Sequence, residues 1–352
     1  MTPFGAYVHI PFCAHRCDYC AFATWTDRAH LVSRYLAAVS REIDASIADG
    51  LPALTSIFFG GGTPSLVPAD ALMDLLDRLP SGPGAEVTVE CNPDTVTAAL
   101  LGTYVEHGVT RVSLGVQSMQ RHVLTALGRT HDPQNVERSV ALVRASGLST
   151  FNLDVIYGAA GESLDDWRAT IVRCLDFDPV HVSAYGLTVE AGTPLADDPS
   201  RHPDDDDQAD KYLLADALLS QAGLVNYEIS NWARPGSECR HNLLYWEQGE
   251  YVGFGCAAHS HRRGTRWWNV RTIERYVALI EEGSSAEGGR EKLDADGRRL
   301  EGLQLALRTR GGVPAKTLPV DELPGLVDID DGQARLTVSG RLLANEVALR
   351  LR

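Results

Sequence analysis

The stretch Cys13-Ala-His-Arg-Cys17-Asp-Tyr-Cys20 decides how the rest of the chain is interpreted. Three cysteines lie within eight residues, directly after the apolar run Ala6-Tyr7-Val8-His9-Ile10. The spacing C-x3-C-x2-C lets three thiolates on one loop hold three irons of a cubane iron–sulfur cluster, and the fourth iron is then open for chemistry. A zinc site is the alternative that the spacing leaves open, with His15 as a fourth ligand.

The composition predicts a cytoplasmic protein. The chain has 352 residues, 44% of them hydrophobic, and a formal net charge of −15, with no basic stripe, so nucleic acid is not an expected partner. Seven cysteines, three of them clustered, fit a reducing cytosol rather than a disulfide framework. We see neither a signal peptide nor an apolar run of about 18 residues, the length that a membrane-spanning helix needs.

Short apolar runs alternate with longer helical patterns, which is typical of parallel βα units. We expect six strands, at Ala6–Ile10, Ser56–Phe59, Glu86–Glu90, Arg111–Gly115, Thr150–Ile156 and His181–Tyr185. The expected helices, chosen by a 3.6-residue apolar period, are Leu31–Ala48, Ala69–Leu79, Pro133–Ser146 and Asp165–Leu175. The predicted fold class is therefore α/β, a partial (β/α)6 barrel similar to a TIM barrel.

Polar and glycine-rich segments follow these strands where each one ends. In parallel α/β folds, ligands bind at the carboxyl ends of the strands. We therefore expect one site on one rim of the barrel. The segments are the cysteine loop, Gly60-Gly61-Gly62-Thr63-Pro64, Glu90-Cys91-Asn92-Pro93, Gly115-Val116-Gln117-Ser118, Asp154–Gly158 and Ser183–Thr188.

The last third of the chain has a different character. Residues 197–207 hold six aspartates, which we interpret as a solvated loop leading into a helix at 211–222. An aromatic and histidine-rich segment follows at 227–268, and glycines and serines at 283–289 predict a linker.

The C-terminal residues predict a small α+β unit of winged-helix-like order. Because it lacks a basic recognition face, we expect it to be a packing module. Its elements are helix 296–307, a β pair at 326–329 and 334–338 around Asp331-Gly332, and helix 340–351. The predicted domains are the barrel (1–225), an aromatic segment packing on it (226–282) and the C-terminal unit (290–352).

The motifs together resemble the radical S-adenosylmethionine (SAM) superfamily. Tyr7-Val8-His9-Ile10-Pro11-Phe12 before the cysteines, the Gly60–Pro64 segment and Asn152–Gly158 resemble the branch that contains oxygen-independent coproporphyrinogen III oxidase. The segment His241-Asn242-Leu243-Leu244-Tyr245-Trp246 matches H-N-x-x-Y-W, a signature of the HemW haem chaperones. The resemblance covers nearly the whole chain, and on these motifs it is identified as a member of the HemW family.

Two differences from the oxidase argue against its reaction. The oxidase has a further cysteine two residues after the motif, where this chain has Phe22. The oxidase also has an N-terminal extension over its active site, whereas this sequence begins twelve residues before Cys13. Decarboxylation of coproporphyrinogen III or a related tetrapyrrole is therefore the alternative function, behind a haem chaperone.

The resemblance implies a [4Fe-4S] cluster and SAM as cofactors. In the superfamily an electron from the cluster cleaves SAM into methionine and a 5′-deoxyadenosyl radical, and retained cleavage is a hypothesis for this chain. No residue is assigned a catalytic role. The implied cluster ligands are Cys13, Cys17 and Cys20, and the implied SAM-binding residues are Tyr7, Tyr19, Gly61, Gly62, Thr63, Glu90, Gln117, Arg129, Asp154 and Thr188.

The HemW resemblance further implies haem as cargo. His241 is the expected iron ligand, Cys239, His259 and His261 are its rivals, and Trp246 offers either aromatic surface to the macrocycle or core packing. The implied partners are haem-acceptor proteins, such as membrane-bound cytochromes or respiratory enzymes, and an electron donor for the cluster. Haem transfer would then bring a cytoplasmic protein to the membrane periphery.

Overall fold

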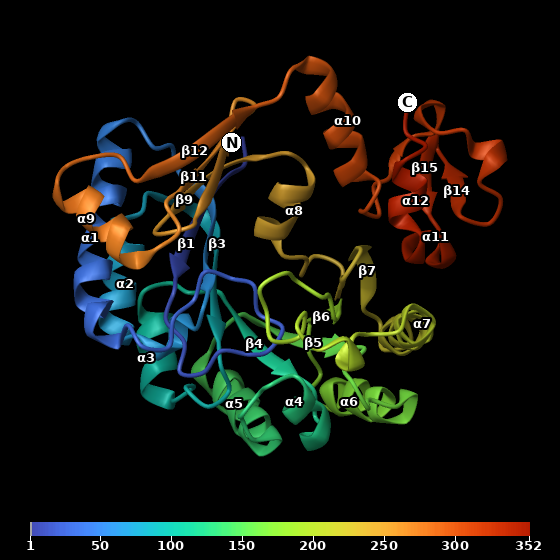
Figure 1. Cartoon of the computed structure of the whole chain (residues 1–352), viewed down its shortest axis with the longest axis horizontal. Coiled ribbons are helices and arrows are strands. Elements are labelled where there is room, and N and C mark those ends of the chain that lie inside the picture. Colours follow the sequence, from blue (N-terminus) through green and yellow to red (C-terminus); the bar gives the residue numbers. More distant parts are fainter. Residues whose placement is uncertain (1) are drawn as a thin grey trace.

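The first half of the chain forms a curved parallel sheet with helices on its outer face, in a computed structural model that describes residues 2–352 (Figure 1). Six strands pair in chain order, and every pairing among them is parallel. In the first strand six of seven residues are buried, as expected where both faces are covered. The strands are β1 (Phe4–Ile10), β2 (Leu54–Gly61), β3 (Ser81–Cys91), β4 (Arg111–Gln117), β5 (Thr150–Tyr157) and β6 (His181–Gly186).

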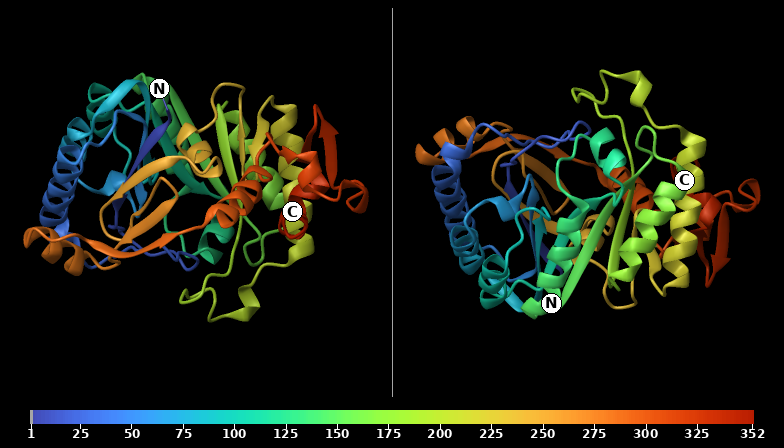
Figure 2. Two further views of the ribbon diagram at one scale, coloured as in Figure 1. Left: turned by 90° about the horizontal axis from the view of Figure 1, so that it is seen from above. Right: turned by 90° about the horizontal axis from the view of Figure 1, so that it is seen from below.

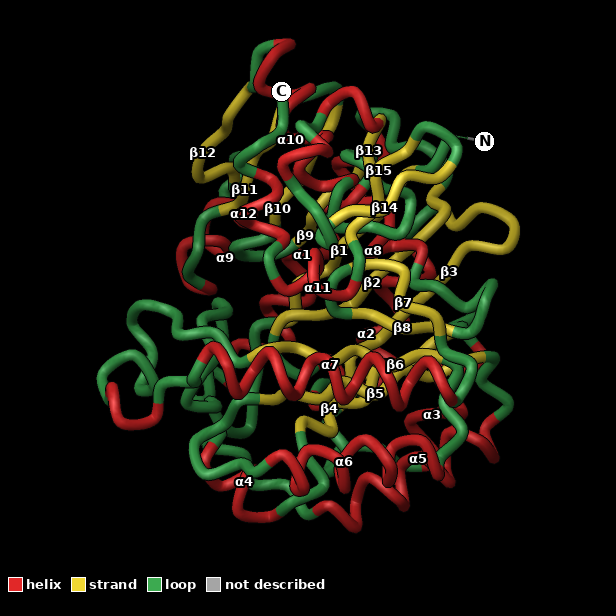
Figure 3. The backbone as a smooth tube through the Cα atoms, turned by 90° about the vertical axis from the view of Figure 1, so that its right-hand side faces the viewer, coloured by secondary structure: helices red, strands yellow, loops and turns green. Residues whose placement is uncertain are grey.

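A helix or pair of helices follows each of these strands and packs on the outside of the sheet. Figure 3 shows four of them, α4 to α7, as an outer layer. The helices are α1 (Val32–Ala48), α2 (Ala69–Arg78), α3 (Ala98–Glu106), α4 (Arg121–Ala126), α5 (Pro133–Ser146), α6 (Leu164–Asp176) and α7 (Asp205–Gln221). The predicted α/β class is confirmed, although α3 and α4 were not predicted.

The last four of the six aspartates cap and begin a helix, whereas Asp197 and Asp198 lie in the predicted loop. Asp204 caps α7 by accepting from the Asp207 amide (2.9 Å), and Asp205–Asp207 form its first turn. Negative charge is favourable there because the helix dipole places partial positive charge at the N-terminus. The predicted helix 211–222 therefore begins six residues too late.

The sheet does not close into a barrel, because other strands extend it beyond β1 and β6. The neighbour of β6 is an antiparallel strand, β8, and the second neighbour of β1 is a parallel strand, β9. The residues 226–282 thus continue the sheet on both flanks and supply the helices α8 (Arg240–Trp246) and α9 (Ile273–Glu281). The flanking strands are β7 (Val225–Glu228), β8 (Asn231–Ala233), β9 (Glu250–Phe254), β10 (His259–Arg262) and β11 (Thr265–Asn269).

The predicted linker at 283–289 is wrong in its second half. Strand β12 (Glu287–Lys292) pairs antiparallel with β11 and forms the edge of the twelve-stranded sheet. Gly289 is needed in that strand because a Cβ there would lie 2.6 Å from the Trp268 ring. The glycine pair therefore marks a close strand–aromatic contact rather than a flexible connection.

The C-terminal residues form a second, smaller hydrophobic cluster, distinct from the main core. Figures 1 and 2 show this unit (red) beside α7, joined to the sheet by α10 (Ala295–Ala306). The predicted β pair and its turn at Asp331-Gly332 are present, but the single final helix is wrong, because Leu343 leaves helical geometry (φ −108°, ψ 25°). The elements are β13 (Val313–Pro314), β14 (Val327–Asp330), β15 (Gln333–Leu336), α11 (Val338–Leu342) and α12 (Ala344–Ala348). No helix within residues 2–352 combines the length and the hydropathy needed to span a bilayer.

Candidate functional site

The cysteine loop is held in place by hydrogen bonds at its ends and its centre. The amide of Cys13 donates to the Trp25 carbonyl (3.0 Å), and the amide of Trp25 donates to the Pro11 carbonyl (2.8 Å). At the centre, the carboxylate of Asp18 accepts from the Arg201 guanidinium (2.7 Å). The loop is thereby fixed across the carboxyl end of the parallel sheet.

The three cysteine side chains line a single cavity of about 650 Å³. Its walls come from the cysteine loop, which follows β1, and from the carboxyl ends of the other five parallel strands, as the strand-end rule predicts. Twelve of the fourteen residues predicted for the site line this cavity. They are Cys13, Cys17, Tyr19, Cys20, Gly61, Gly62, Thr63, Glu90, Gln117, Arg129, Asp154 and Thr188.

Two polar side chains donate to the thiols. Thr63 Oγ1 lies 3.7 Å from Cys13 Sγ, and Arg129 Nη1 lies 3.4 Å from Cys17 Sγ. Burial raises the pKa of the Cys13 and Cys20 thiols, so the folded protein alone holds them neutral. A bound metal would release these protons, because metals bind the thiolate form.

Two carboxyl groups also line the cavity. Glu90 accepts the Gly61 amide (3.0 Å), and Asp154 accepts the Ser113 hydroxyl (2.7 Å). Burial and the charge of Asp154 raise the pKa of Glu90 to about 8, and burial also raises the pKa of Asp154. This pair suits a ligand that brings positive charge or several hydroxyl groups.

The cavity also contains residues that the sequence interpretation missed. Ser113 lies two residues before Gly115 on β4, so it points to the same face, and Thr24 ends the cysteine loop. His131 is 4% exposed, and neither ring nitrogen has a hydrogen-bond partner among the described residues. In the sequence, only its position two residues after Arg129 pointed to His131 as a residue of this cavity.

The three cysteines line the cavity separately. Within residues 2–352, no three histidine, cysteine, aspartate or glutamate side chains converge on one such position. His15 lines the same cavity without completing a compact tetrahedron with the thiols, which a structural zinc site needs. Separate thiols around one cavity instead fit a cluster, in which each thiolate binds a different iron.

Tyr7 and His241 are not among the residues that line this cavity. Tyr7 hydrogen-bonds His9 (3.0 Å) and stacks on Phe58. His241 is 1% exposed, and its two ring nitrogens pair with Ser56 Oγ (2.9 Å) and Tyr245 Oη (2.8 Å). Burial lowers the pKa of His241 to about 3, so its imidazole is neutral.

Comparison with known proteins agrees with the motifs. Residues 7–174 match the model of the radical SAM superfamily. Proteins named "Heme chaperone HemW" align from Mycobacterium tuberculosis (40% identity, 99% of this chain, 95% of the relative) and Bacillus subtilis (34%, 97% of each). The chain belongs to the HemW family. A third relative of that name, from Escherichia coli, is 39% identical over 74% of this chain and 70% of its own length.

A solved structure shares the fold over the whole chain. Coproporphyrinogen III oxidase (HemN) from Escherichia coli, described as a radical SAM enzyme, superimposes with a TM-score of 0.87. The match covers 99% of this chain and 89% of that structure, at 22% identity. It therefore establishes a radical SAM fold with a mostly parallel, unclosed sheet.

Proposed function

We propose that this protein binds haem and delivers it to acceptor proteins, with a [4Fe-4S] cluster and SAM at the cysteine loop. The observation that carries the proposal is the alignment of proteins named heme chaperone with 97–99% of this chain. His241, in the H-N-x-x-Y-W segment, is buried and has both ring nitrogens hydrogen-bonded, one of them to Ser56 on β2. This part of the segment is therefore packed in the core beside β2.

The cysteine cavity has the donor set that a cluster requires. Cys13, Cys17 and Cys20 would hold three irons, and the family's cluster, when bound, supplies the electron that cleaves SAM. Thr63 and Arg129 donate toward two of these sulfurs, and hydrogen bonds to cluster sulfurs tune the reduction potential. Glu90 and Asp154 would hold the ribose hydroxyls and the positive charges of SAM.

Reconstitution with iron and sulfide tests the cluster. We expect the wild-type chain to gain about four irons and a broad absorption band at the short-wavelength end of the visible spectrum. We also expect SAM to change the electron paramagnetic resonance spectrum of the reduced cluster. Cys17→Ala should lose the iron, whereas Cys174→Ala, which alters a buried cysteine on α6, should keep it. Equal iron content in the two variants would contradict the assignment.

Haem titration tests the cargo. A Soret band that saturates at a fixed ratio of haem to protein is expected, followed by transfer of the haem to an added apo-cytochrome. Failure of the wild-type chain to bind haem would refute the function proposed.

The rival function is oxidation of coproporphyrinogen III. Phe22, which stands where the oxidase has a further cysteine, lines the mouth of the cavity and is 67% exposed. We therefore expect no anaerobic turnover of coproporphyrinogen III by the reconstituted protein with SAM and dithionite. Formation of protoporphyrinogen would favour the enzyme instead.

A further inference from the structure

Helix α8 has two faces with different roles. Its inner face, with His241 and Leu244, packs on β1 so closely that a Cβ on Gly5 would lie 2.6 Å from Leu244. The His241 ring also stacks on Phe58, with ring centres 5.4 Å apart. The inner face is therefore buried against β1 and β2, and His241 is not free to bind iron while these contacts hold.

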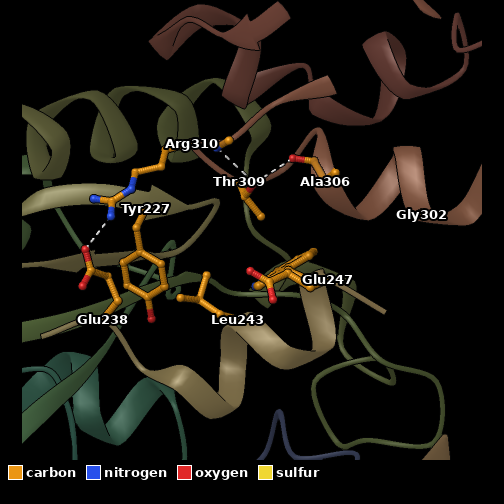
Figure 4. A pocket seen from close by; sticks show the side chains of 10 residues that line it. Tyr227, Glu238, Leu243, Glu247, Gly302, Ala306, Thr309 and Arg310 are labelled. Carbon is orange, nitrogen blue, oxygen red and sulfur yellow. Dashed lines mark hydrogen bonds and ion pairs between the residues drawn. The ribbon is translucent and has the colours of Figure 1, made fainter. Parts of the chain in front are cut away.

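The outer face of α8 borders a second cavity, of about 460 Å³, far from the cysteines in the sequence (Figure 4). Leu243, Trp246 and Glu247 form one wall. The opposite wall comes from α10 and the residues after it, where Gly302, Ala306 and Gly311 have little or no side chain. We call this space the α8–α10 cleft.

The apolar part of the cleft suits a flat apolar ligand, although Glu238 and Glu247 also line it. An indole and a leucine face a wall of small residues, so a planar ring system can lie between the two helices. Arg310, at the rim, is 52% exposed and uses one guanidinium nitrogen to pair with Glu238 (2.7 Å). Its other N–H groups can donate to a carboxylate.

The cavity beside the cysteines is less suitable for the same ligand. Glu90, Asp94, Asp154 and Glu190 all line it. The proposed cluster and SAM would already fill this space.

The cleft contains one residue of a type that ligates haem iron, and that residue is engaged elsewhere. The Tyr227 hydroxyl bonds His181 Nε2 (2.8 Å) and accepts the Cys239 amide (3.3 Å). In Figure 4 this hydroxyl points away from Thr309 and Ala306. The ten lining residues include no histidine, cysteine or methionine.

We propose that the α8–α10 cleft is the haem site, that the macrocycle rather than an iron–side-chain bond supplies the affinity, and that His241 is a positioning residue holding α8. This rests on the proposed function. Ala306 on one wall packs against the smaller C-terminal cluster, to which no residue of α8 belongs. Haem that is bound through its ring alone can transfer to an acceptor protein, because the acceptor adds a bond to the iron.

The first test uses the wild-type, cluster-loaded chain with haem and iron-free protoporphyrin IX, followed by absorbance and fluorescence. We expect the two affinities to agree within about tenfold, because both offer the same ring. A preference for haem above about a hundredfold would mean that iron ligation carries the affinity, and would overturn the proposal. Absence of haem binding altogether would instead refute the proposed function.

The second test fills the cleft. Ala306→Trp should weaken haem binding by at least about tenfold and leave the response of the cluster to SAM unchanged. Ala295→Trp, on the exposed first turn of the same helix, is the matched control and should bind haem as the wild type does. Equal haem affinity of the two variants would overturn the proposal.

The third test separates positioning from ligation at His241. His241→Ala should lower the midpoint of thermal unfolding, while the Soret maximum of bound haem stays at its wild-type wavelength. A shifted Soret maximum with unchanged binding of protoporphyrin IX would show that the imidazole ligates the iron, and would overturn its role as a positioning residue.

Discussion

At Gly62 the chain has no room for a side chain. A Cβ there would lie 2.7 Å from the Phe12 carbonyl oxygen and 2.8 Å from that of Ile10, and neither backbone atom can move aside easily. Gly62→Ala should therefore cost about 2 kcal/mol of unfolding free energy and disturb the adjacent cysteine loop. Gly102→Ala, with open space around it on α3, should stabilise by up to about 1 kcal/mol. Denaturant titration compares them, and similar stability of the two variants would contradict this.

Glu90 should make the stability of the cluster-free protein depend on pH. Its pKa is raised to about 8 by burial and by Asp154, from 4.5, so the folded state holds a proton that the unfolded chain releases earlier. The unfolding free energy of the wild type should then fall as the pH rises between about 4.5 and about 8. Glu90→Gln cannot ionise, so its advantage over the wild type should grow across this window and be absent at the acidic end. Chemical denaturation at several pH values measures the two unfolding free energies. A difference between wild type and Glu90→Gln that does not change with pH would show that Glu90 is not the cause.

At the scale of elements, a buried lysine ties α7 to the loop that follows β5. Lys211 is fully buried, and its Nζ donates to the Glu162 carbonyl (2.7 Å) and the Asp207 carboxylate (2.5 Å). Nζ also lies 3.4 Å from Glu162 Oε2, so Lys211→Met would leave this buried carboxyl without its cation and should cost about 3–5 kcal/mol. The exposed Lys316→Met should change stability by under about 0.5 kcal/mol. Chemical denaturation measures both variants. A small loss of unfolding free energy in each would argue that Lys211 does not hold α7 to this loop.

At the scale of the whole molecule, an ion pair docks the C-terminal unit on α7. Arg341 makes a bidentate pair with Asp216 (2.9 and 3.1 Å), and both side chains are at most 14% exposed. Arg341→Ala should destabilise by about 3 kcal/mol, because the Asp216 charge stays in a largely buried place. Arg335→Ala removes an exposed pair with Asp330 and should cost under about 1 kcal/mol.

Limited proteolysis provides the readout for the docking. Cleavage within residues 308–312, which join α10 to β13, should become faster in Arg341→Ala, since the unit beyond α10 would leave α7 more often. Unchanged cleavage in that variant would mean that other contacts dock the unit.

The sequence by itself determined the parallel α/β fold and most of the cysteine cavity. Alternation of apolar runs with helical periods located the six strands, and parallel strands necessarily bring their carboxyl ends to one rim. The cysteine loop, Gly61, Glu90 and Asp154 therefore came together without knowledge of the coordinates. Local sequence signals suffice here because each βα unit brings the carboxyl end of its own strand to the same rim.

Only the tertiary structure decided what depends on contacts between distant segments. Strand β9 pairs beside β1 across more than two hundred residues, so no local pattern revealed the unclosed sheet. The sequence predicts a linker at Gly289, whereas the structure places this glycine against the Trp268 ring. The hydrogen bonds of His241 to Ser56 and Tyr245 likewise have no signal in the sequence. Burial and hydrogen-bond partners are properties of the assembled core, and they decide whether a polar side chain holds the fold or faces a ligand.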